Sequence, residues 1–330
     1  FICYKSKINV NMPFAPKNTK VTDLIVGKLG VRRSTARVYA STLAMVAREV
    51  KLKDGIEDLT WLRKKKVLKF VSNINNLTRR KNTASGIIAG LKTIGDKKTI
   101  EQYRDILMQA DKDYTAFLTS GKRKRKYKDA DAAWTQIKGL WRKVSPIIRA
   151  QKIWQLGESI NPSAYRQIMT LIYFKFLSDM PVRRLEYAET RFIDEADFKE
   201  DGGNYIIVRP KKPWTWSLGN YKTSKTFGRQ EFPVSMGLKQ YLKKLRPITQ
   251  SKNKDEYIFM NSRWKKMSRD LFGKFVVSNF NTYLGKRFSQ NTVRSIKVSS
   301  VWKDSVKTLD ALRLAESMAH DPRTAMVHYR

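Results

Sequence analysis

The chain has 330 residues, of which 67 are Lys or Arg and 29 are Asp or Glu, so its formal net charge is +38. Hydrophobic residues make up 41% of it, which is enough to fill a core and excludes a disordered basic tail. The length predicts two domains, and the charge predicts a polyanionic partner, with nucleic acid first. An acidic membrane surface comes second, and since no apolar run approaches the roughly 20 residues of a spanning helix, we expect no membrane insertion.

Cysteine and histidine usage limits the chemistry further. The single cysteine, Cys3, cannot form an intramolecular disulfide, and this fits a reducing compartment. With only two histidines, His320 and His328, the usual Cys/His zinc site is excluded. No Gly-rich phosphate loop stands out either, so we expect neither a metal nor another cofactor. The chain begins at Phe1 without a signal segment, and we expect a fragment or processed form of an intracellular protein.

The first part of the chain reads as an arm followed by helices. Residues 1–20 are polar and are predicted to form the arm, and residues 21–118 are predicted to form a compact all-α domain of four short helices with basic faces. Ser34 and Thr35 are expected to cap the first helix. Its expected apolar face comprises Val38, Leu43, Val46 and Val50. The other helices are predicted in WLRKKKVLKFVSNI, TASGIIAGLKTI and IEQYRDILMQADKDYTAFL.

A basic run follows the predicted helices. The segment GKRKRKYK, residues 121–128, has six basic residues in eight. Because it separates two patterned regions, residues 119–130 are predicted to be an interdomain linker that lies on phosphate. A nuclear-targeting signal is a rival reading that is compatible with the first.

The remaining region, residues 131–330, has a mixed pattern. Helical pattern covers 130–180, including IMTLIYFKFL, and returns from Ser268 onward. NYIIVRP (204–210) and RQEFPV (229–234) have a strand-like period, and the segment between them is rich in turn residues. We therefore expect a small antiparallel β-sheet with a long hairpin, in a fold that is mainly α (α+β). Near-helical spacing predicts that three tryptophans pack in the core: Trp134, Trp141 and Trp154.

Several chemically capable side chains follow one another in this second region. Arg183 begins Arg-x-x-Glu (RRLE, 183–186) directly after an apolar helix, and Lys225 lies in SKTFGRQEFP beside the predicted hairpin. Arg294 follows in NTVRS, and AHDPRTAMVHYR then places His320 nine residues before Tyr329. Taken alone, each of these residues is more often a surface charge, a helix cap or a core residue than a catalytic one. Order and spacing together carry the signal, and HDPRTAMVHYR is its most specific part.

In this order the set resembles the tyrosine recombinases, also called phage-type integrases, and the resemblance spans residues 20–330. It implies an all-α core-binding domain followed by a catalytic domain. It also implies that the chain acts on duplex DNA inside the cell, as a homo-oligomer, a tetramer on DNA. The implied catalytic roles are a phosphate clamp for Arg183 and Arg294, the general acid for Lys225, phosphate contact or proton handling for His320, and the nucleophile that forms a 3′-phosphotyrosyl link for Tyr329.

Three positions depart from the family pattern. The family usually has His three residues before its second arginine, and this chain has Asn291 there, which can hydrogen-bond a phosphate oxygen but cannot relay a proton. The usual Gly before the later histidine is Ala319. The sequence ends at Arg330, whereas family members continue beyond the nucleophile, so we expect further residues there.

The predicted residues suit phosphoryl chemistry without a metal. Negative charge builds on a phosphodiester as it is attacked, and two guanidiniums, permanently charged and fork-shaped, match that charge. They also favour the phenolate of Tyr329, and a lysine can protonate the leaving oxygen. One unbroken helix would point His320 and Tyr329 in nearly opposite directions, and Asp321-Pro322 supplies a break that lets the tyrosine return.

Two assignments stay open at this point. Arg184 is an alternative to Arg183, although only Arg183 has Glu186 three places on. Lys222 is an alternative to Lys225, which is preferred because its Ser-Lys-Thr stands eight residues before Pro233.

Three functions fit the sequence. The first is a site-specific recombinase or integrase that cuts and rejoins duplex DNA without metal or ATP. The second is a type IB topoisomerase that relaxes supercoils by the same chemistry. The third is a DNA-binding or architectural protein with an inactive recombinase-like domain. Nothing in the sequence identifies the target DNA.

Overall fold

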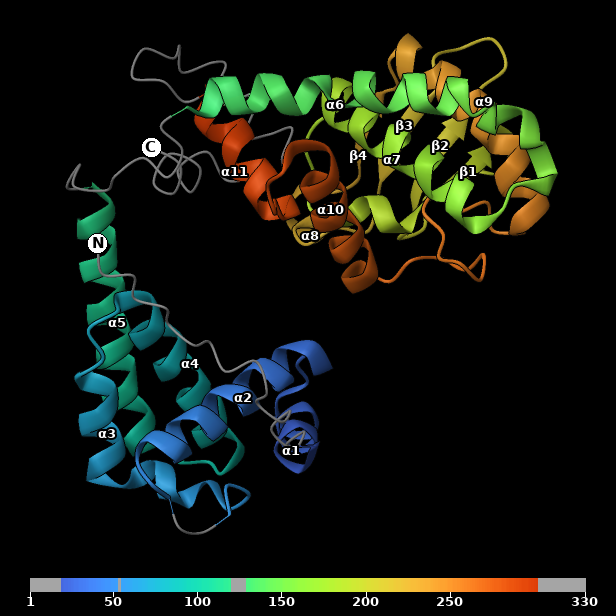
Figure 1. Cartoon of the computed structure of the whole chain (residues 1–330). Coiled ribbons are helices and arrows are strands. Elements are labelled where there is room, and N and C mark those ends of the chain that lie inside the picture. Colours follow the sequence, from blue (N-terminus) through green and yellow to red (C-terminus); the bar gives the residue numbers. More distant parts are fainter. Residues whose placement is uncertain (1–18, 53–54, 120–128, 302–330) are drawn as a thin grey trace. The chain divides into compact units, whose positions relative to one another are not determined.

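The computed structural model describes residues 19–52, 55–119 and 129–301 (Figure 1). The expectations for residues 1–18, for the basic run at 121–128 and for the segment that holds His320 and Tyr329 therefore lie outside the described residues. The chain divides into two compact units, Phe1–Lys124 and Arg125–Arg330.

The first unit is all-helical in its described part. Its elements are α1 (Thr19–Leu29), α2 (Arg33–Glu49), the 3₁₀ helix η1 (Leu59–Arg63), α3 (Lys65–Ser72), α4 (Leu77–Thr93) and α5 (Lys97–Thr119). Helix α4 packs against both α2 and α5. A Cβ on Gly90 of α4 would stand 2.8 Å from Leu62 Cδ1, so this glycine permits the close approach of η1. Leu43, Ile87 and Tyr103 are fully buried in the shared core.

Several details of the first unit differ from the sequence expectations. Helix α1 begins at Thr19, inside the expected arm. Helix α2 begins at Arg33, because the main-chain carbonyl of Arg32 already accepts from the amide of Thr35, so Ser34 does not cap the helix. Val38 is 63% exposed and does not join Leu43 in the core. There are also five α-helices in the described part of this unit, and α5 has 23 residues rather than being short.

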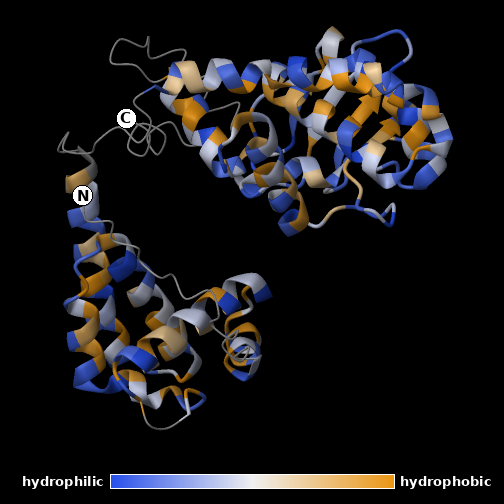
Figure 2. Ribbon diagram, viewed as in Figure 1, coloured by the Kyte–Doolittle hydropathy of each residue, from blue (hydrophilic) through white to orange (hydrophobic). Residues whose placement is uncertain are grey.

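The second unit combines helices with one small sheet. Its helices are α6 (Ala130–Ala150), η2 (Ile153–Ser159), α7 (Pro162–Asp179), η3 (Glu186–Glu189), η4 (Glu195–Asp197), α8 (Ser224–Phe227), α9 (Met236–Lys252), α10 (Arg269–Leu284) and α11 (Gln290–Val301). Helix α7 starts on an Asn161 cap followed by Pro162 and packs against α6 on one side. On another side its Phe176 ring meets Trp216 of the sheet at 5.1 Å, so α7 forms the centre of the core. Figure 2 shows the apolar residues of each unit on the faces that helices turn toward their neighbours.

The sheet has four strands in the order β1 (Thr190–Asp194), β2 (Asn204–Val208), β3 (Thr215–Leu218) and β4 (Gln230–Pro233). Strands β2, β3 and β4 are antiparallel, but β1 pairs with β2 in parallel, so the sheet is mixed rather than antiparallel. The expected hairpin between 204–210 and 229–234 is wrong, because the turn-rich segment between them contains β3, which pairs with both. Strand β3 was not predicted from the sequence, because its four buried residues are flanked by Gly, Pro and Asn.

The helical prediction for 130–180 is confirmed by α6 and α7, and the one from Ser268 onward is confirmed by α10 and α11 as far as residue 301, where the described residues end. The core packing of the tryptophans is confirmed as well: Trp134 is 7% exposed, and Trp141 and Trp154 are half-buried against the same core. No helix within the described ranges is long and apolar enough to cross a bilayer.

Candidate active site

Arg183 lies in the segment that follows α7, and it is buried, with 2% of its surface exposed. Its Nη1 donates to Gln230 Oε1 across 2.8 Å, and its Cζ lies 4.7 Å from the centre of the Tyr221 ring. Burial lowers the pKa of the Arg183 guanidinium, and the negative charge of Glu186 opposes that shift. A guanidinium remains charged at neutral pH even so, which gives the second unit a fixed, buried positive charge.

Arg294 on α11 is also buried, at 5% exposure. Both arginines act on one phenol: burial raises the pKa of Tyr187, and the charges of Arg183 and Arg294 act in the opposite direction. The Tyr187 hydroxyl also accepts a hydrogen bond from the main-chain amide of Arg183 at 3.1 Å. Gln290, four residues before Arg294 on α11, donates from its Nε2 to the Arg183 carbonyl across 2.7 Å. The structure thus brings together the two chain segments that carry Arg183 and Arg294.

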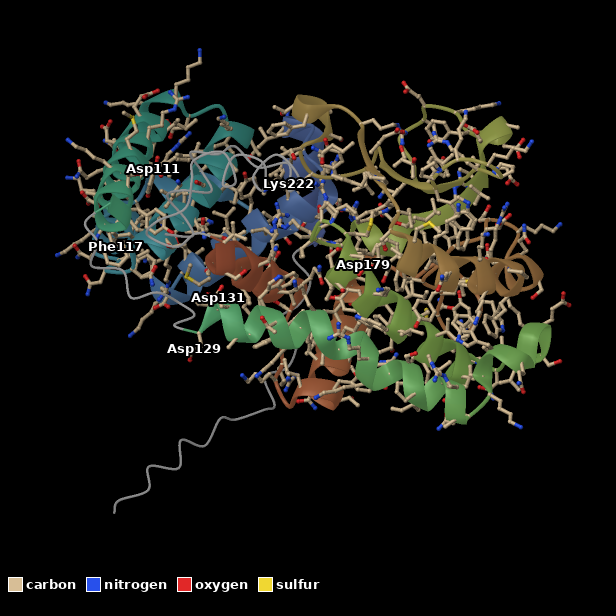
Figure 3. The ribbon with its side chains drawn as sticks, turned by 90° about the horizontal axis from the view of Figure 1, so that it is seen from above. Asp111, Phe117, Asp129, Asp131, Asp179 and Lys222 are labelled. Atoms are coloured by element: carbon tan, nitrogen blue, oxygen red, sulfur yellow. The ribbon has the colours of Figure 1, made fainter. Side chains whose placement is uncertain are left out.

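The segment between β3 and β4 carries the two candidate lysines. Tyr221 lies near the start of the segment, with its ring next to the Arg183 guanidinium. Gln230 lies at the end of the segment and accepts the hydrogen bond from Arg183. The Tyr221 hydroxyl donates to the carbonyl of Gly228, which ties the two ends together. Between them Lys225 lies on α8 and Lys222 precedes it, and both side chains are exposed; Lys222 is labelled in Figure 3. Both lysines therefore sit on a short loop whose two ends contact Arg183.

Asn291 is at the start of α11 and is exposed. Its Oδ1 accepts from Arg184 Nε across 3.2 Å. Of the neighbouring arginines, Arg183 is buried and contacts Gln230, whereas Arg184 is half-buried and reaches Asn291. The two neighbouring arginines therefore have different surroundings, and only Arg183 is buried.

Glu186, the last residue of Arg-x-x-Glu, is buried at 4% exposure. Its Oε2 accepts from the main-chain amide of Arg184 at 2.6 Å, which fixes the turn after Arg183. Its own carbonyl accepts from Thr190 Oγ1 and Asn204 Nδ2, at 3.2 and 3.3 Å. Glu186 therefore connects the arginine turn to the sheet as well as balancing its charge.

The sequence reasoning missed the residues that hold this arrangement together: Tyr187, Tyr221, Gln230 and Gln290. Gln290 Nε2 donates to the carbonyl of Arg183, and Tyr187 packs edge-on against Tyr173 of α7. None of them carries a recognisable motif, and their roles depend on contacts between segments far apart in the chain. Their positions directly beside the motif residues were the one available signal.

Two of the predicted residues, His320 and Tyr329, lie outside the described residues together with Asp321-Pro322, so their roles stay predictions. Within residues 19–52, 55–119 and 129–301, no three His, Cys, Asp or Glu side chains are grouped so that they could hold a metal ion. No known protein-family model matches the chain, and no curated protein matches it.

Proposed function

We propose that the chain is a tyrosine recombinase that cuts and rejoins duplex DNA through a phosphotyrosyl intermediate. The observation that carries the proposal is the burial of both Arg183 and Arg294, on two chain segments that the hydrogen bond from Gln290 to the Arg183 carbonyl joins. Guanidiniums offer paired, permanently charged donors to an anionic group. A scissile phosphate is the anion that the motif order predicts.

The arginine pair suits the reaction for a physical reason. The two non-bridging oxygens of the phosphate gain charge as the fifth bond forms, and a guanidinium offers paired donors to such oxygens. Because the contacts to Gln230, Tyr221 and Tyr187 hold Arg183 in place, little reorganisation is needed when charge develops. Preorganised donors of this kind contribute strongly to rate.

The other residues complete the cycle. The Tyr329 oxygen attacks phosphorus and forms a new bond to it, while the bond between phosphorus and the 5′ oxygen breaks. Lys225, on the loop anchored at Arg183, donates the proton that the leaving oxygen takes. Asn291 bonds a phosphate oxygen, and His320 contacts the phosphate or handles the tyrosine proton. The reverse reaction rejoins a strand, so no ATP is needed, and strand exchange takes place within a homo-oligomer.

The first unit would hold the DNA. Its segment around η1 and α3 exposes four lysines in a row of six residues: Lys64, Lys65, Lys66 and Lys69. Exposed lysines on one short helix are suited to phosphate contacts, which position a protein on DNA without reading its sequence. The basic run at 121–128 is proposed to lie on phosphate as well.

A nicked duplex, from which the cleaved short strand diffuses away, tests the proposal. The expected result is a covalent protein–DNA adduct, and mass spectrometry of the nucleotide-linked peptide should identify Tyr329. Tyr329→Phe should abolish the adduct while duplex binding is retained. An adduct that forms equally well with Tyr329→Phe would show that the nucleophile is wrong.

The same preparation separates the alternatives. Relaxation of a supercoiled plasmid without any strand-exchange product would favour a type IB topoisomerase. Tight, salt-sensitive binding with no adduct from any nicked duplex would favour an architectural protein. Salt dependence alone does not discriminate, because many phosphate contacts produce it in each case.

A further inference from the structure

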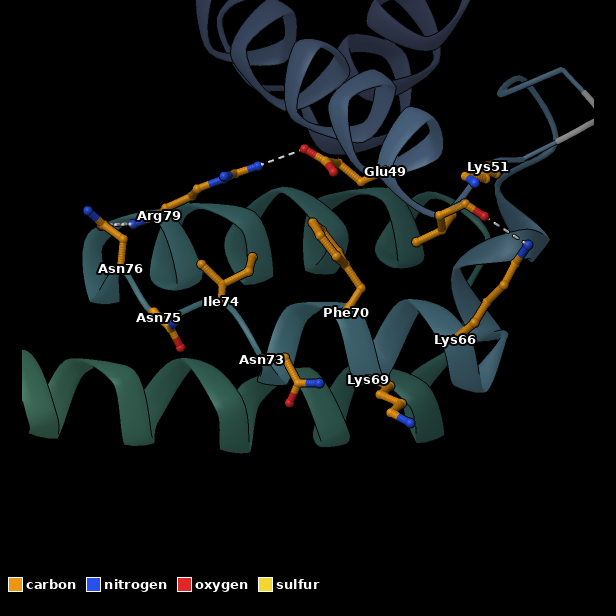
Figure 4. Close-up of a pocket in the computed structure, with 11 residues that line it drawn as sticks. Glu49, Lys51, Lys66, Lys69, Phe70, Asn73, Ile74, Asn75, Asn76 and Arg79 are labelled. Carbon is orange, nitrogen blue, oxygen red and sulfur yellow. Dashed lines mark hydrogen bonds and ion pairs between the residues drawn. The ribbon is translucent and has the colours of Figure 1, made fainter.

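A pocket of about 720 Å³ opens on the first unit, between the end of α2, the length of α3 and the start of α4 (Figure 4). A volume of this size falls in the usual range for small-molecule sites. The pocket belongs wholly to the first unit, so it is separate from the site around Arg183. Its lining divides into three kinds of side chain.

The middle of the pocket is apolar. Phe70 is half-buried and Ile74 is 8% exposed, and Figure 4 shows both between α3 and α4. A half-buried ring that lines an open pocket offers a surface on which a planar group can stack. Such stacking accepts any nucleobase, because every base has a π-face.

The two sides of the pocket differ in chemistry. Lys51 and Lys66 lie on one side in Figure 4 and Asn75 and Asn76 on the other, while Lys69 and Asn73 lie next to each other between them. All three lysines and all three asparagines are exposed. Ammonium groups attract phosphate, and an amide presents both a donor and an acceptor to the edge of a base. The cations, the apolar floor and the amides suit the phosphate, the face of the base and the edge of the base in one nucleotide.

The walls of the pocket are fastened to each other. Arg79 of α4 forms an ion pair with Glu49 of α2, with 3.0 Å between Nη2 and Oε1. Lys66 Nζ donates to the carbonyl of Val50 across 3.1 Å. Asn76 Oδ1 accepts from the main-chain amide of Arg79 at 2.9 Å and so caps α4. Because Glu49 is matched by Arg79, the three lysines leave the pocket with a net positive charge.

We propose that this pocket binds a single unstacked nucleotide of the DNA, with its base over Phe70, its phosphate at Lys51, Lys66 and Lys69, and its base edge at the asparagines. The proposal rests on the proposed function only in taking DNA as the partner. A paired base inside a duplex cannot enter the pocket. The site therefore favours DNA that offers an extrahelical or single-stranded base, and flexible or distorted steps offer such a base at the lowest cost.

The test measures equilibrium binding of the full chain to a perfect duplex, to the same duplex with one unpaired thymidine, and to the matching single strand. Wild type should bind the bulged duplex about tenfold more tightly than the perfect one, the size of one base–aromatic stack. Phe70→Leu keeps the apolar packing but removes the ring face. It should remove the bulge preference while leaving perfect-duplex binding unchanged.

Charge variants supply the matched control. Lys65 and Lys69 are both exposed on α3, but Lys69 lines the pocket and Lys65 does not. Lys69→Glu should weaken bulged-duplex binding more than perfect-duplex binding, whereas Lys65→Glu should weaken both by the same factor. Iodouracil at the bulge should also photo-crosslink to the peptide that contains Phe70. Circular dichroism and thermal unfolding check that each variant is folded.

The possible outcomes separate this proposal from the recombinase proposal. A bulge preference that depends on Phe70 supports the pocket even if no phosphotyrosyl adduct ever forms. Equal affinity of wild type for the two duplexes, or a bulge preference that survives in Phe70→Leu, overturns it even in an active recombinase. A preference for the single strand over the bulged duplex, lost in Phe70→Leu, also supports the pocket and identifies single-stranded DNA as its source of bases.

Discussion

The side-chain amide of Gln290 donates to the main-chain carbonyl of Arg183 across 2.7 Å, and the Tyr173 hydroxyl donates to the other end of the same amide. Gln290 is 4% exposed and is the first residue of α11, four residues before Arg294. One amide therefore fixes the start of α11 to the segment after α7. This contact explains how two arginines from distant parts of the chain keep a constant spacing.

Gln290→Leu should destabilise the protein. The substitution leaves the Arg183 carbonyl and the Tyr173 hydroxyl buried without their partner, at about 1–3 kcal/mol for each group. We expect a loss of about 2–6 kcal/mol in the free energy of unfolding, measured by urea denaturation. Gln151→Leu, at an exposed position after α6, is the control and should change stability by less than about 0.5 kcal/mol. Equal losses in the two variants would contradict the bridging role.

Arg183→Lys and Arg294→Lys should each slow formation of the covalent adduct. Lysine keeps the charge but lacks the paired donors of guanidinium, and loss of one such donor costs about 100- to 1000-fold in rate. Duplex binding should stay near that of wild type, because most of the charge is retained. Arg209→Lys replaces an arginine paired with Glu195 away from the site and should react as wild type does. The measurement is single-turnover cleavage of the nicked duplex.

A DNA substrate with sulfur in place of the bridging 5′ oxygen tests whether Lys225 or Lys222 is the general acid. If Lys225 protonates the leaving 5′ oxygen, Lys225→Ala should react slowly on ordinary DNA. Replacing that oxygen by sulfur should restore the rate, because a thiolate with a reference pKa near 8.5 leaves without a proton. The defect of Arg183→Lys should persist on the sulfur substrate. Rescue of Lys222→Ala instead of Lys225→Ala would reverse the assignment.

The hydrogen bond between Arg184 and Asn291 predicts that these residues act as one unit. Arg184 Nε holds Asn291 Oδ1 at 3.2 Å, which leaves the amide NH₂ of Asn291 to donate to a phosphate oxygen. Arg184→Ala should therefore slow cleavage although Arg184 is not expected to touch the phosphate. In a double-mutant cycle with Asn291→Ala the two effects should be non-additive by about 1 kcal/mol. Strictly additive effects would mean that Arg184 acts elsewhere.

The sequence predicted the helices of the second unit better than its sheet. Helix α7 has an Asn-Pro start followed by the largely apolar stretch IMTLIYFKFL, so local signals suffice to identify it. Strand β3 has four residues and lies in a segment rich in turn residues, and its pairing with both neighbours is a tertiary effect. The parallel pairing of β1 with β2 likewise depends on the chain crossing that no local pattern reports.

The candidate site was predictable in its charged residues and not in their supports. Arg183 and Arg294 stood out because their type and order match a chemistry. Tyr221 and Gln230 did not, because an aromatic ring and an amide acquire a role only when folding places them against Arg183. The pocket around Phe70 escaped notice for the same reason, since its lining comes from three helices.

The ion pairs of Arg246 predict how acid affects the second unit. Arg246 Nη1 and Nη2 bind the two carboxylate oxygens of Asp194 at 3.0 and 2.7 Å, and Nε binds Glu256 at 3.0 Å. The hydrogen bonds from Arg246 hold the pKa of Asp194 below its ordinary value of 3.8. The carboxylate therefore contributes its full stabilisation above pH 3.8 and loses it as the pH falls through the lowered pKa of the folded state.

Asp194→Asn should follow that dependence. Because the Asp194 side chain is 50% exposed, the variant should lose no more than about 1 kcal/mol in the free energy of unfolding near pH 7. The difference from wild type should shrink at a second, acidic pH well below 3.8, as the carboxyl becomes protonated first in the unfolded and then in the folded state. Asp197→Asn, at an exposed position three residues on, should match wild type at both pH values. Urea denaturation at the two pH values measures the effect. If the difference between Asp194→Asn and wild type persists in acid, Asp194 acts through packing or hydrogen bonding of its neutral form rather than through its charge.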